Sequence, residues 1–264
     1  MPQLFHVDAF TAQPFAGNPA AVLYASAPLP DTTLQAIAAE MNLSETAFVF
    51  PQQENLFLLR WFTPQTEVEL CGHATLASAH VLWQQLDCPH PVLRFATRSG
   101  ELTARRGDNG IELNFPAAKP QAITLPTGLL AALGLTATRY TGSANGKWII
   151  EVDSEEQVLA LQPDFNALRQ LEGRGVMVTA RASRSGYDFV SRYFAPWVGV
   201  DEDPVTGSNH GILASYWQPI LQQTRFMAWQ ASARGGEMEV HLTGERVLLF
   251  GQAVTLSRGE WLLP

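Results

Sequence analysis

Four side chains of this sequence have the chemistry to move a proton on a small molecule, namely Glu45, His73, Asp203 and Ser208. A proton shift beside a carbonyl group or along a diene needs one base, which takes the proton from one carbon and returns it to another. Glu45 lies in a short connection between an expected helix and an apolar strand, where a scaffold commonly holds a reacting group. Desolvation in a closed cleft would raise the pKa of its carboxyl group toward the value such a base needs. Glu45 is therefore the candidate acid/base, although an isolated glutamate is more often an exposed surface residue.

His73 lies at the start of an expected helix over residues 73–86. Asp203 ends an acidic run, residues 201–203, that precedes a second expected helix over 208–222. A helix N-terminus carries unpaired N–H groups and a partial positive charge, so an imidazole there tends to stay neutral and to donate hydrogen bonds. The same positions suit a buried histidine held by the backbone, and an acidic residue that only complements the helix dipole. Both alternatives remain open at this point.

Backbone amides at the two helix starts are candidates for holding a carboxylate and a developing oxyanion. Ser208 adds a hydroxyl, and its alternative role as a helix N-cap is compatible with ligand binding. The two glycines after Arg234 would permit close approach of a backbone to a ligand, and plain turn glycines are an equally good account. The candidate substrate-binding residues are Gly72, Ala74, Gly207, Ser208, Asn209, Gly235 and Gly236.

The elements that must position these residues occur twice, because the chain repeats itself in order. Such a repeat indicates an internal duplication into two halves of about 130 residues each. We expect an α+β fold in which strands dominate, with one long helix per half, in domains 1–118 and 119–264. Two facing halves would place a ligand in the cleft between them. The repeated segments are residues 57–64 and 189–196, 71–74 and 206–209, and 98–102 and 234–238.

The apolar spacing predicts the remaining elements. A helix over 31–41 would be capped by Asp31 or Thr32. The other expected helices cover 125–134 and 164–171, and the clearest strands cover 56–62, 175–180 and 187–194.

Four ordered motifs closely resemble the PhzF-like isomerases of phenazine biosynthesis, a family that shares the fold of diaminopimelate epimerase. They are GNPAAV at 17–22, NLSETAF at 42–48, CGHAT at 71–75 and DPVTGSN at 203–209. The resemblance spans the whole chain. It implies two facing domains, each a barrel-like sheet around a central helix. It also implies a cofactor-independent proton shift on a small carboxylic acid, in a homodimer.

The resemblance also assigns residue roles. The glutamate of the second motif is the family's acid/base residue, which implies this role for Glu45. The third motif carries a site histidine, here His73. The aspartate of the fourth motif contacts the substrate and helps to place the migrating proton, which implies this role for Asp203, and Ser208 matches a site serine.

Cys71 distinguishes this chain from the related two-thiol racemases, which use one cysteine from each half as opposed acid and base. The second half has Thr206 at the duplicated position. Cys88 lies past the far end of the 73–86 helix and in the wrong half, so it cannot substitute. We therefore expect Cys71 to be a small packed residue.

Composition excludes several other functions. The formal net charge is -8, and no Lys/Arg-rich run points to nucleic acid or an anionic membrane surface. No secretory signal, membrane span or disulfide framework is recognisable, which favours a cytoplasmic protein. His80 falls two helical turns beyond His73 without further clustered ligands, so no metal is expected. No G-x-G-x-x-G follows a strand, so no dinucleotide cofactor is expected either.

The leading interpretation is an isomerase that moves a proton on a small unsaturated or amino-bearing carboxylic acid. One alternative is an amino-acid racemase or epimerase. Another is a binding protein that kept the carboxylate site and lost catalysis.

Overall fold

The computed structural model describes residues 1–107 and 110–262, which form two compact units. Unit 1 contains Met1–Phe115 together with the segment from Leu248 onward, and unit 2 contains Pro116–Val247. The expected boundary after residue 118 lies close to the first crossing between the units. The expectation that the second domain runs to residue 264 is wrong, because the last strand pairs antiparallel with the first strand of unit 1.

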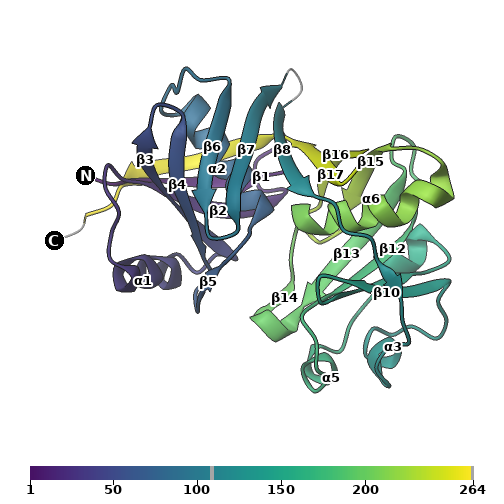
Figure 1. The fold of residues 1–264 in the computed structure, drawn as a ribbon. Helices are drawn as coiled ribbons and strands as arrows, with labels where there is room; N and C mark the ends of the chain where they lie inside the picture. The colour runs from purple at the N-terminus through teal and green to yellow at the C-terminus, as the bar shows by residue number, and fades with distance from the viewer. Residues whose placement is uncertain (108–109, 263–264) are drawn as a thin grey trace. The chain divides into compact units, whose positions relative to one another are not determined.

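Unit 1 is a mixed sheet in the order β18–β1–β2–β3–β4–β6–β7–β8 (Figure 1). The pairs β2–β3 and β4–β6 are parallel, and the other pairs in this order are antiparallel. The short strand β5 pairs with β4, and β17 crosses from unit 2 into unit 1. The elements are β1 (Gln3–Ala9), β2 (Asn18–Tyr24), α1 (Asp31–Met41), β3 (Glu45–Gln53), β4 (Leu56–Phe62), β5 (Glu67–Val68), α2 (Gly72–Gln84), β6 (Val92–Thr97), β7 (Gly100–Gly107), β8 (Gly110–Pro116), β17 (Arg246–Gly251) and β18 (Ala253–Glu260).

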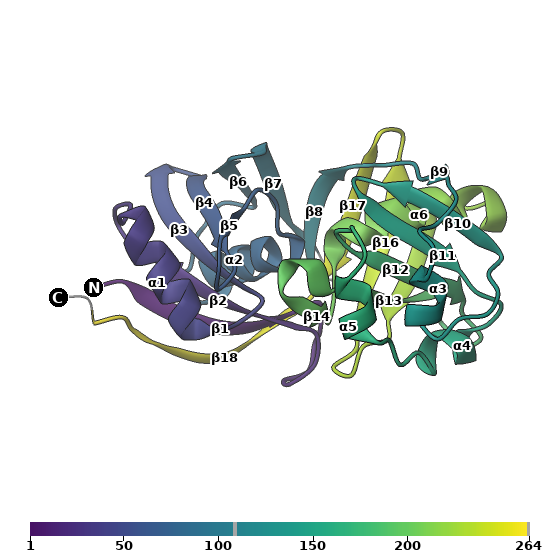
Figure 2. The ribbon, with the colours of Figure 1, turned by 90° about the horizontal axis from the view of Figure 1, so that it is seen from below.

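Helix α2 is buried around its whole circumference, because its sequence is apolar or small on every side. It packs against β1, β2, β3 and β18. The opposite face of the sheet is covered by α1, which lies on the outside of unit 1 (Figure 2). Successive side chains of β3 point to opposite faces of the sheet. Phe48 and Phe50 pack with α1, whereas Ala47 and Val49 point to the other face.

Unit 2 repeats this arrangement in the order β9–β10–β11–β12–β13–β15–β16. The pairs β11–β12 and β13–β15 are parallel, and the others are antiparallel. Its elements are β9 (Gln121–Ala122), α3 (Leu129–Ala132), β10 (Tyr140–Ala144), β11 (Lys147–Glu151), α4 (Glu155–Leu159), α5 (Phe165–Arg169), β12 (Val176–Arg181), β13 (Phe189–Ala195), the 3₁₀ helix η1 (Pro196–Val198), β14 (Val200–Glu202), α6 (Gly207–Leu221), β15 (Arg225–Gln230) and β16 (Gly236–Thr243).

Helix α6 takes the place of α2 and is buried from Asn209 to Trp217. The indole of Trp217 stacks on Phe189 and donates a hydrogen bond of 3.2 Å to the Thr179 hydroxyl. The other face of this sheet is covered by α3, α4 and α5 through Leu129, Val158 and Leu168.

One ion pair also recurs before each central helix. In unit 1 the Arg60 guanidinium of β4 binds both carboxylate oxygens of Glu67 on β5, at 2.8 Å each. In unit 2 Arg192 of β13 binds Glu202 of β14 in the same two-point manner, at 2.7 and 2.9 Å. Such bidentate pairs fix geometry as well as charge. Both therefore anchor the short strand that leads to the central helix.

Several expected boundaries change for identifiable reasons. Helix α1 has the expected bounds, but its N-cap is Pro30, and Asp31 pairs with Arg60 instead of capping. The helix expected over 125–134 is only one turn long, because Gly128 is left-handed at its N-cap. Helix α4 was not expected, although Ser154 accepts a hydrogen bond from the Gln157 N–H, a capping pattern visible in the sequence.

Among the described residues, no helix is long and apolar enough to cross a membrane.

Candidate active site

Glu45 and His73 lie side by side in unit 1, with 3.4 Å between Glu45 Oε2 and His73 Nε2. Glu45 is the first residue of β3, and His73 is the second residue of α2. Parallel neighbouring strands begin at the same edge of a sheet, so β2 and β3 bring Asn18 and Glu45 together beside the start of α2. The His73 side chain is only 4% exposed, whereas 20% of the Glu45 side chain is exposed. The carboxylate is thus reachable and the imidazole is enclosed.

A hydrogen-bond network fixes the protonation of the His73 ring. The Asn18 amide lies 3.1 Å from Nδ1, and its Nδ2 atom can only donate. The Ser44 hydroxyl donates to Asn18 Oδ1 at 3.3 Å and lies 3.4 Å from His73 Nε2. Nδ1 therefore accepts and Nε2 carries the proton, on the side of the ring that faces the Glu45 carboxylate.

Burial lowers the pKa of His73 to about 3, because the charged imidazolium would lose its hydration. The imidazole is consequently neutral at physiological pH. The alternative of a histidine held only by the backbone is wrong, since its recorded partners are the side chains of Asn18, Ser44, Cys71 and Glu45.

This buried histidine should make unfolding depend on pH. Below pH 6.5 the unfolded chain protonates His73 and the folded chain does not, so its contribution is complete above pH 6.5 and is lost as pH falls toward 3. Between pH 7.5 and 5 we expect His73 alone to reduce the free energy of unfolding by roughly 2 kcal/mol. Urea unfolding of the wild type and of His73→Asn at both pH values measures this, and the variant should lose correspondingly less. Equal losses in the two proteins would contradict a neutral buried His73.

Cys71 is buried at the N-cap of α2, with its Sγ atom 3.5 Å from His73 Nδ1. Its thiol, one imidazole nitrogen and a Glu45 carboxylate oxygen lie within 4.8 Å of one another, a set of donors that could suit a metal ion. The two ring nitrogens of His73 thus face different partners, Cys71 at Nδ1 and Glu45 at Nε2.

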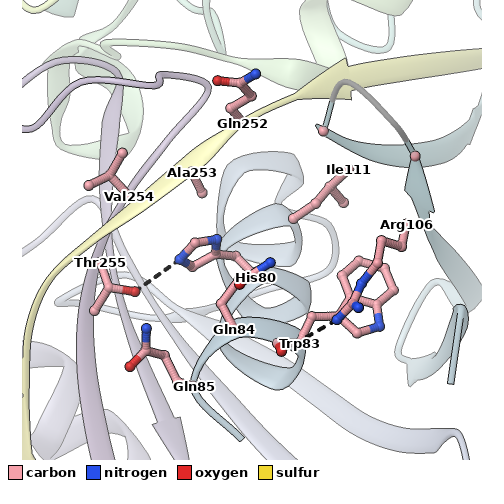
Figure 3. A pocket seen from close by; sticks show the side chains of 12 residues that line it. His80, Trp83, Gln84, Gln85, Arg106, Ile111, Gln252, Ala253, Val254 and Thr255 are labelled. Carbon is pink, nitrogen blue, oxygen red and sulfur yellow. Dashed lines mark hydrogen bonds between the residues drawn. The ribbon is translucent and has the colours of Figure 1, made fainter. Parts of the chain in front are cut away.

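His80 does not join this group. It lines a cavity of about 570 Å³ within unit 1, near the C-terminal end of α2, and its Nε2 atom is 2.9 Å from the Thr255 hydroxyl (Figure 3). Burial lowers the pKa of His80 to about 4. Arg106 lies over the indole of Trp83 in the same cavity. None of the sequence-predicted site residues lines this space.

In unit 2 the acidic run at 201–203 separates into three different roles. Asp201 pairs with Arg169, and Glu202 forms the bidentate pair with Arg192. Asp203 points instead to the loop before α6. The alternative that this run only complements the helix dipole is therefore wrong for its first two members, which bind specific arginines.

Hydrogen bonds fix the loop at residues 203–206, which precedes α6. The Thr206 hydroxyl donates to Asp203 Oδ2, and the Gln230 amide donates to the Asp203 carbonyl at 2.7 Å. The Thr206 N–H in turn donates to Gln230 Oε1 at 2.8 Å, and the Asp203 N–H to the Tyr193 carbonyl at 3.1 Å. Gln230 is buried and holds the backbone at Asp203 and Thr206, while the Thr206 hydroxyl contacts the Asp203 carboxylate.

The two glycines predicted near a ligand support the same loop. Gly235 adopts φ +64, which favours glycine, and its N–H donates to the Ser232 carbonyl and hydroxyl at 3.0 and 3.1 Å. The Ser232 hydroxyl donates to the Pro204 carbonyl at 2.9 Å. Gly235 is therefore a turn glycine with a structural task, and Gly236 begins β16.

Ser208 and Asn209 lie at the start of α6, as Gly72 and Ala74 lie at the start of α2. Ser208 is not the N-cap, which is Thr206. The Lys147 ammonium instead donates to the Ser208 hydroxyl at 3.1 Å and to Asn209 Oδ1 at 2.7 Å. The start of α6 thus carries a positive charge from a strand that is distant in sequence.

A model of the phenazine biosynthesis-like proteins, the PhzC-PhzF family, matches residues 7–259. An uncharacterised isomerase of Pseudomonas aeruginosa is 52% identical, with 97% of each chain covered. A crystal structure of a PhzF-family protein from Enterococcus faecalis has 40% identity and a TM-score of 0.93, covering 99% of both chains. This chain belongs to the PhzF family.

The PhzF fold is a sheet-dominated α+β fold that extends beyond the family. A probable proline racemase from Agrobacterium radiobacter matches with a TM-score of 0.67 at 12% identity, covering 100% of this chain and 94% of that one. At that identity the likeness concerns the fold alone.

Sequence reasoning overlooked several residues of this PhzF-family chain. Asn18 and Ser44 lie inside the quoted motifs, so their polar side chains beside buried strands were an available signal. Gln230 and Lys147 lie outside every motif, and only the folded chain brings them to the starts of the loop and helix.

Proposed function

We propose that this chain is a cofactor-independent isomerase that shifts a proton on a small unsaturated or amino-bearing carboxylic acid, with Glu45 as the acid/base. The observation that supports this best is the partly exposed Glu45 carboxylate beside an enclosed, neutral His73. The curated relative from Pseudomonas aeruginosa is itself named an isomerase. The proposal includes a homodimer, on the family resemblance, and a cytoplasmic location, on the sequence composition.

In the proposed reaction, Glu45 both removes and returns the proton, so no other proton donor or acceptor is required. The Glu45 carboxylate takes a proton from one carbon, and the electron pair of the broken C–H bond enters the neighbouring π-system. Glu45, now a carboxylic acid, returns the proton to another carbon of that system and becomes a carboxylate again. Substrate and product are isomers, so no oxidant or reductant is consumed.

The pKa of His73 explains why Glu45 takes the proton. An imidazole whose pKa is about 3 is a poor base, and protonating it would bury an unhydrated charge. Its Nε2–H instead faces the Glu45 carboxylate, where a neutral donor orients the base without neutralising it. In this proposal His73 polarises and orients, and it does not carry the migrating proton.

The remaining proposed roles belong to Asp203 and to the starts of the two central helices. Asp203 contacts the substrate and helps to place the proton, on the strength of its motif and of the hydrogen bonds that fix its loop. The proposed carboxylate-binding N–H groups lie at helix starts, where the first N–H groups lack a carbonyl one turn earlier. In unit 2 they are those of Gly207, Ser208 and Asn209, of which the Asn209 N–H also donates to the Thr206 carbonyl at 3.2 Å. In unit 1 they are those of Gly72 and Ala74.

Proton NMR in D₂O tests the proposal. The protein is incubated with trans-2,3-dihydro-3-hydroxyanthranilate and with a panel of amino and unsaturated carboxylic acids. Deuterium entering one carbon, with a shifted double bond, is the expected result. Deuterium at the α-carbon with loss of optical activity would indicate a racemase instead. Binding without any exchange would favour a carboxylate-binding protein and would contradict the isomerase.

A further inference from the structure

Helix α2 begins at the candidate active site and ends at the cavity of about 570 Å³ that His80 lines (Figure 3). The lining residues come from the last turns of α2, from the adjoining ends of β7 and β8, and from the chain around the start of β18, all in unit 1. Small-molecule sites in proteins commonly have volumes of about 300–1,000 Å³. The cavity is therefore large enough for a ligand, and the side chains that face it decide which one.

The strand pattern directs Arg106 toward this cavity. Alternate side chains of β7 share a face, and Leu102 and Ala104, which precede Arg106 on its face, are buried. Ile111 lies opposite Arg106 on β8, is also buried and also lines the cavity. Arg106 thus continues an inward-facing row past its buried part, and its side chain lines the cavity.

Two contacts hold the Arg106 guanidinium over Trp83 (Figure 3). Its Cζ atom lies 5.3 Å from the centroid of the indole ring, and its Nη2 atom donates to the Trp83 carbonyl at 3.4 Å. The indole is itself fixed, because its N–H donates to the His90 carbonyl at 2.7 Å and the residue is only 4% exposed. A guanidinium has five N–H donors, and the bond to Trp83 is long. The indole therefore positions the guanidinium while leaving most of its donors for a further acceptor.

The charge of the lining favours an anion. Arg106 is the only residue with a charged side chain among the described residues that line the cavity, since burial lowers the pKa of His80 to about 4 and keeps its imidazole neutral. A cation would meet this positive charge without compensation. A carboxylate or a phosphate group supplies the opposite charge, and its oxygens match the donor fork of a guanidinium. The apolar part of the wall, which includes Trp83, Ile111 and Val254, suits a hydrophobic body.

We propose that this cavity is a second ligand site, for a small organic anion whose charged oxygens are bound by Arg106 and whose apolar body lies against Trp83 and Ile111. Carboxylates and phosphate monoesters share the chemistry that this site recognises. The assignment uses no residue of the proposed isomerase reaction. Failure of that reaction would leave the second site standing, and loss of the second site would leave the reaction standing.

Benzoate, phenyl phosphate and benzyl alcohol are the probes, because each carries a benzene ring and they differ in charge. In the ¹⁵N-labelled protein, which has seven tryptophans, Trp83→Phe identifies the Trp83 indole N–H signal. At constant ionic strength, benzoate or phenyl phosphate should shift that signal saturably, and benzyl alcohol should bind at least about tenfold more weakly. The tighter of the two anions identifies the headgroup class. Equal affinity for all three probes, or no response of Trp83 to either anion, would overturn the proposal.

Variants of two neighbouring arginines test the role of the guanidinium. Arg106→Gln should lose the preference for the anions, and Arg106→Lys should keep part of it, because lysine retains the charge without the fork. Arg105→Gln is the matched control, since Arg105 belongs to the other face of β7 and pairs with Glu112 at 3.7 Å. It should bind all three probes as the wild type does.

The same variants separate ligand binding from a purely structural role. An arginine that only caps the C-terminal end of α2, through the Trp83 carbonyl, could be replaced without any effect on anion binding. Unchanged anion preference in Arg106→Gln would therefore refute the proposal. Well-dispersed signals from the other tryptophans in Arg106→Gln would show that the variant is folded, so that its lost preference reports on the site.

Discussion

A Glu45→Gln variant is expected to lose about 10³-fold or more of the wild-type rate of deuterium incorporation. A glutamine amide has the shape of the carboxylate but cannot take up a proton in the relevant pH range. Its carbonyl oxygen can still accept from the His73 Nε2–H that lies 3.4 Å from the carboxylate in the wild type. The network around His73 should thus persist while the base is lost.

The measurement is the D₂O exchange assay, run beside thermal unfolding. Glu40→Gln makes the same chemical change at an exposed position of α1 and should retain the wild-type rate. A midpoint of unfolding within a few degrees of wild type for Glu45→Gln would show that the lost rate is not lost folding. If Glu45→Gln exchanged deuterium as fast as Glu40→Gln, Glu45 would not be the acid/base.

The pairing of Glu45 with His73 illustrates how much of the site the sequence could predict. Both residues were candidates because Glu45 lies in a short connection before a strand and His73 at the start of a helix, in motifs that resemble the PhzF family. The structure brings them together because β2 and β3 are parallel and α2 starts at the same edge. The protonation of His73 could not be predicted, since it depends on Asn18, which lies 55 positions away in the chain.

The second helix start shows the opposite case. The N–H groups of Ser208 and Asn209 follow from any helix that begins after Gly207, and they were predicted. The positive charge beside them was not predicted, because it comes from Lys147. Lys147 lies 61 and 62 positions away and contacts the side chains of Ser208 and Asn209. A pattern of spacing carries no information about such a contact. For the same reason the sequence did not predict the antiparallel pairing of β18 with β1, which returns the chain's end to unit 1.

The central helices were predictable in kind, because a helix that is apolar around its whole circumference must be buried. Their bounds shifted by only one or two residues at each end. The weaker helices of unit 2 were less predictable, since packing on the outer face of the sheet decides where they begin. Gly128 and Ser154 mark two such beginnings.

Replacing Gly17 with alanine is expected to reduce the free energy of unfolding of unit 1 by about 3 kcal/mol or more. Gly17 has φ +65, and a Cβ atom there would lie 2.2 Å from the Ala9 carbonyl oxygen and 2.8 Å from Thr11 Cγ2. The carbonyl belongs to β1 and cannot rotate away, so the backbone itself must move. The next residue is Asn18, whose amide lies beside His73, and the displacement should therefore reach the candidate active site.

Gly100→Ala separates the two causes of this loss, because Gly100 lies in the same unit with φ +98 and no atom within 4 Å of its Cβ position. It should cost only the backbone term of about 1–2 kcal/mol. Urea unfolding of both variants measures the difference, which is the contribution of the clash. ¹⁵N NMR of the His73 ring should show a change in Gly17→Ala and none in Gly100→Ala. Equal losses of stability, with an unchanged His73 ring in both variants, would mean that the backbone before β2 relieves the clash by a small movement. Gly17 would then not position Asn18.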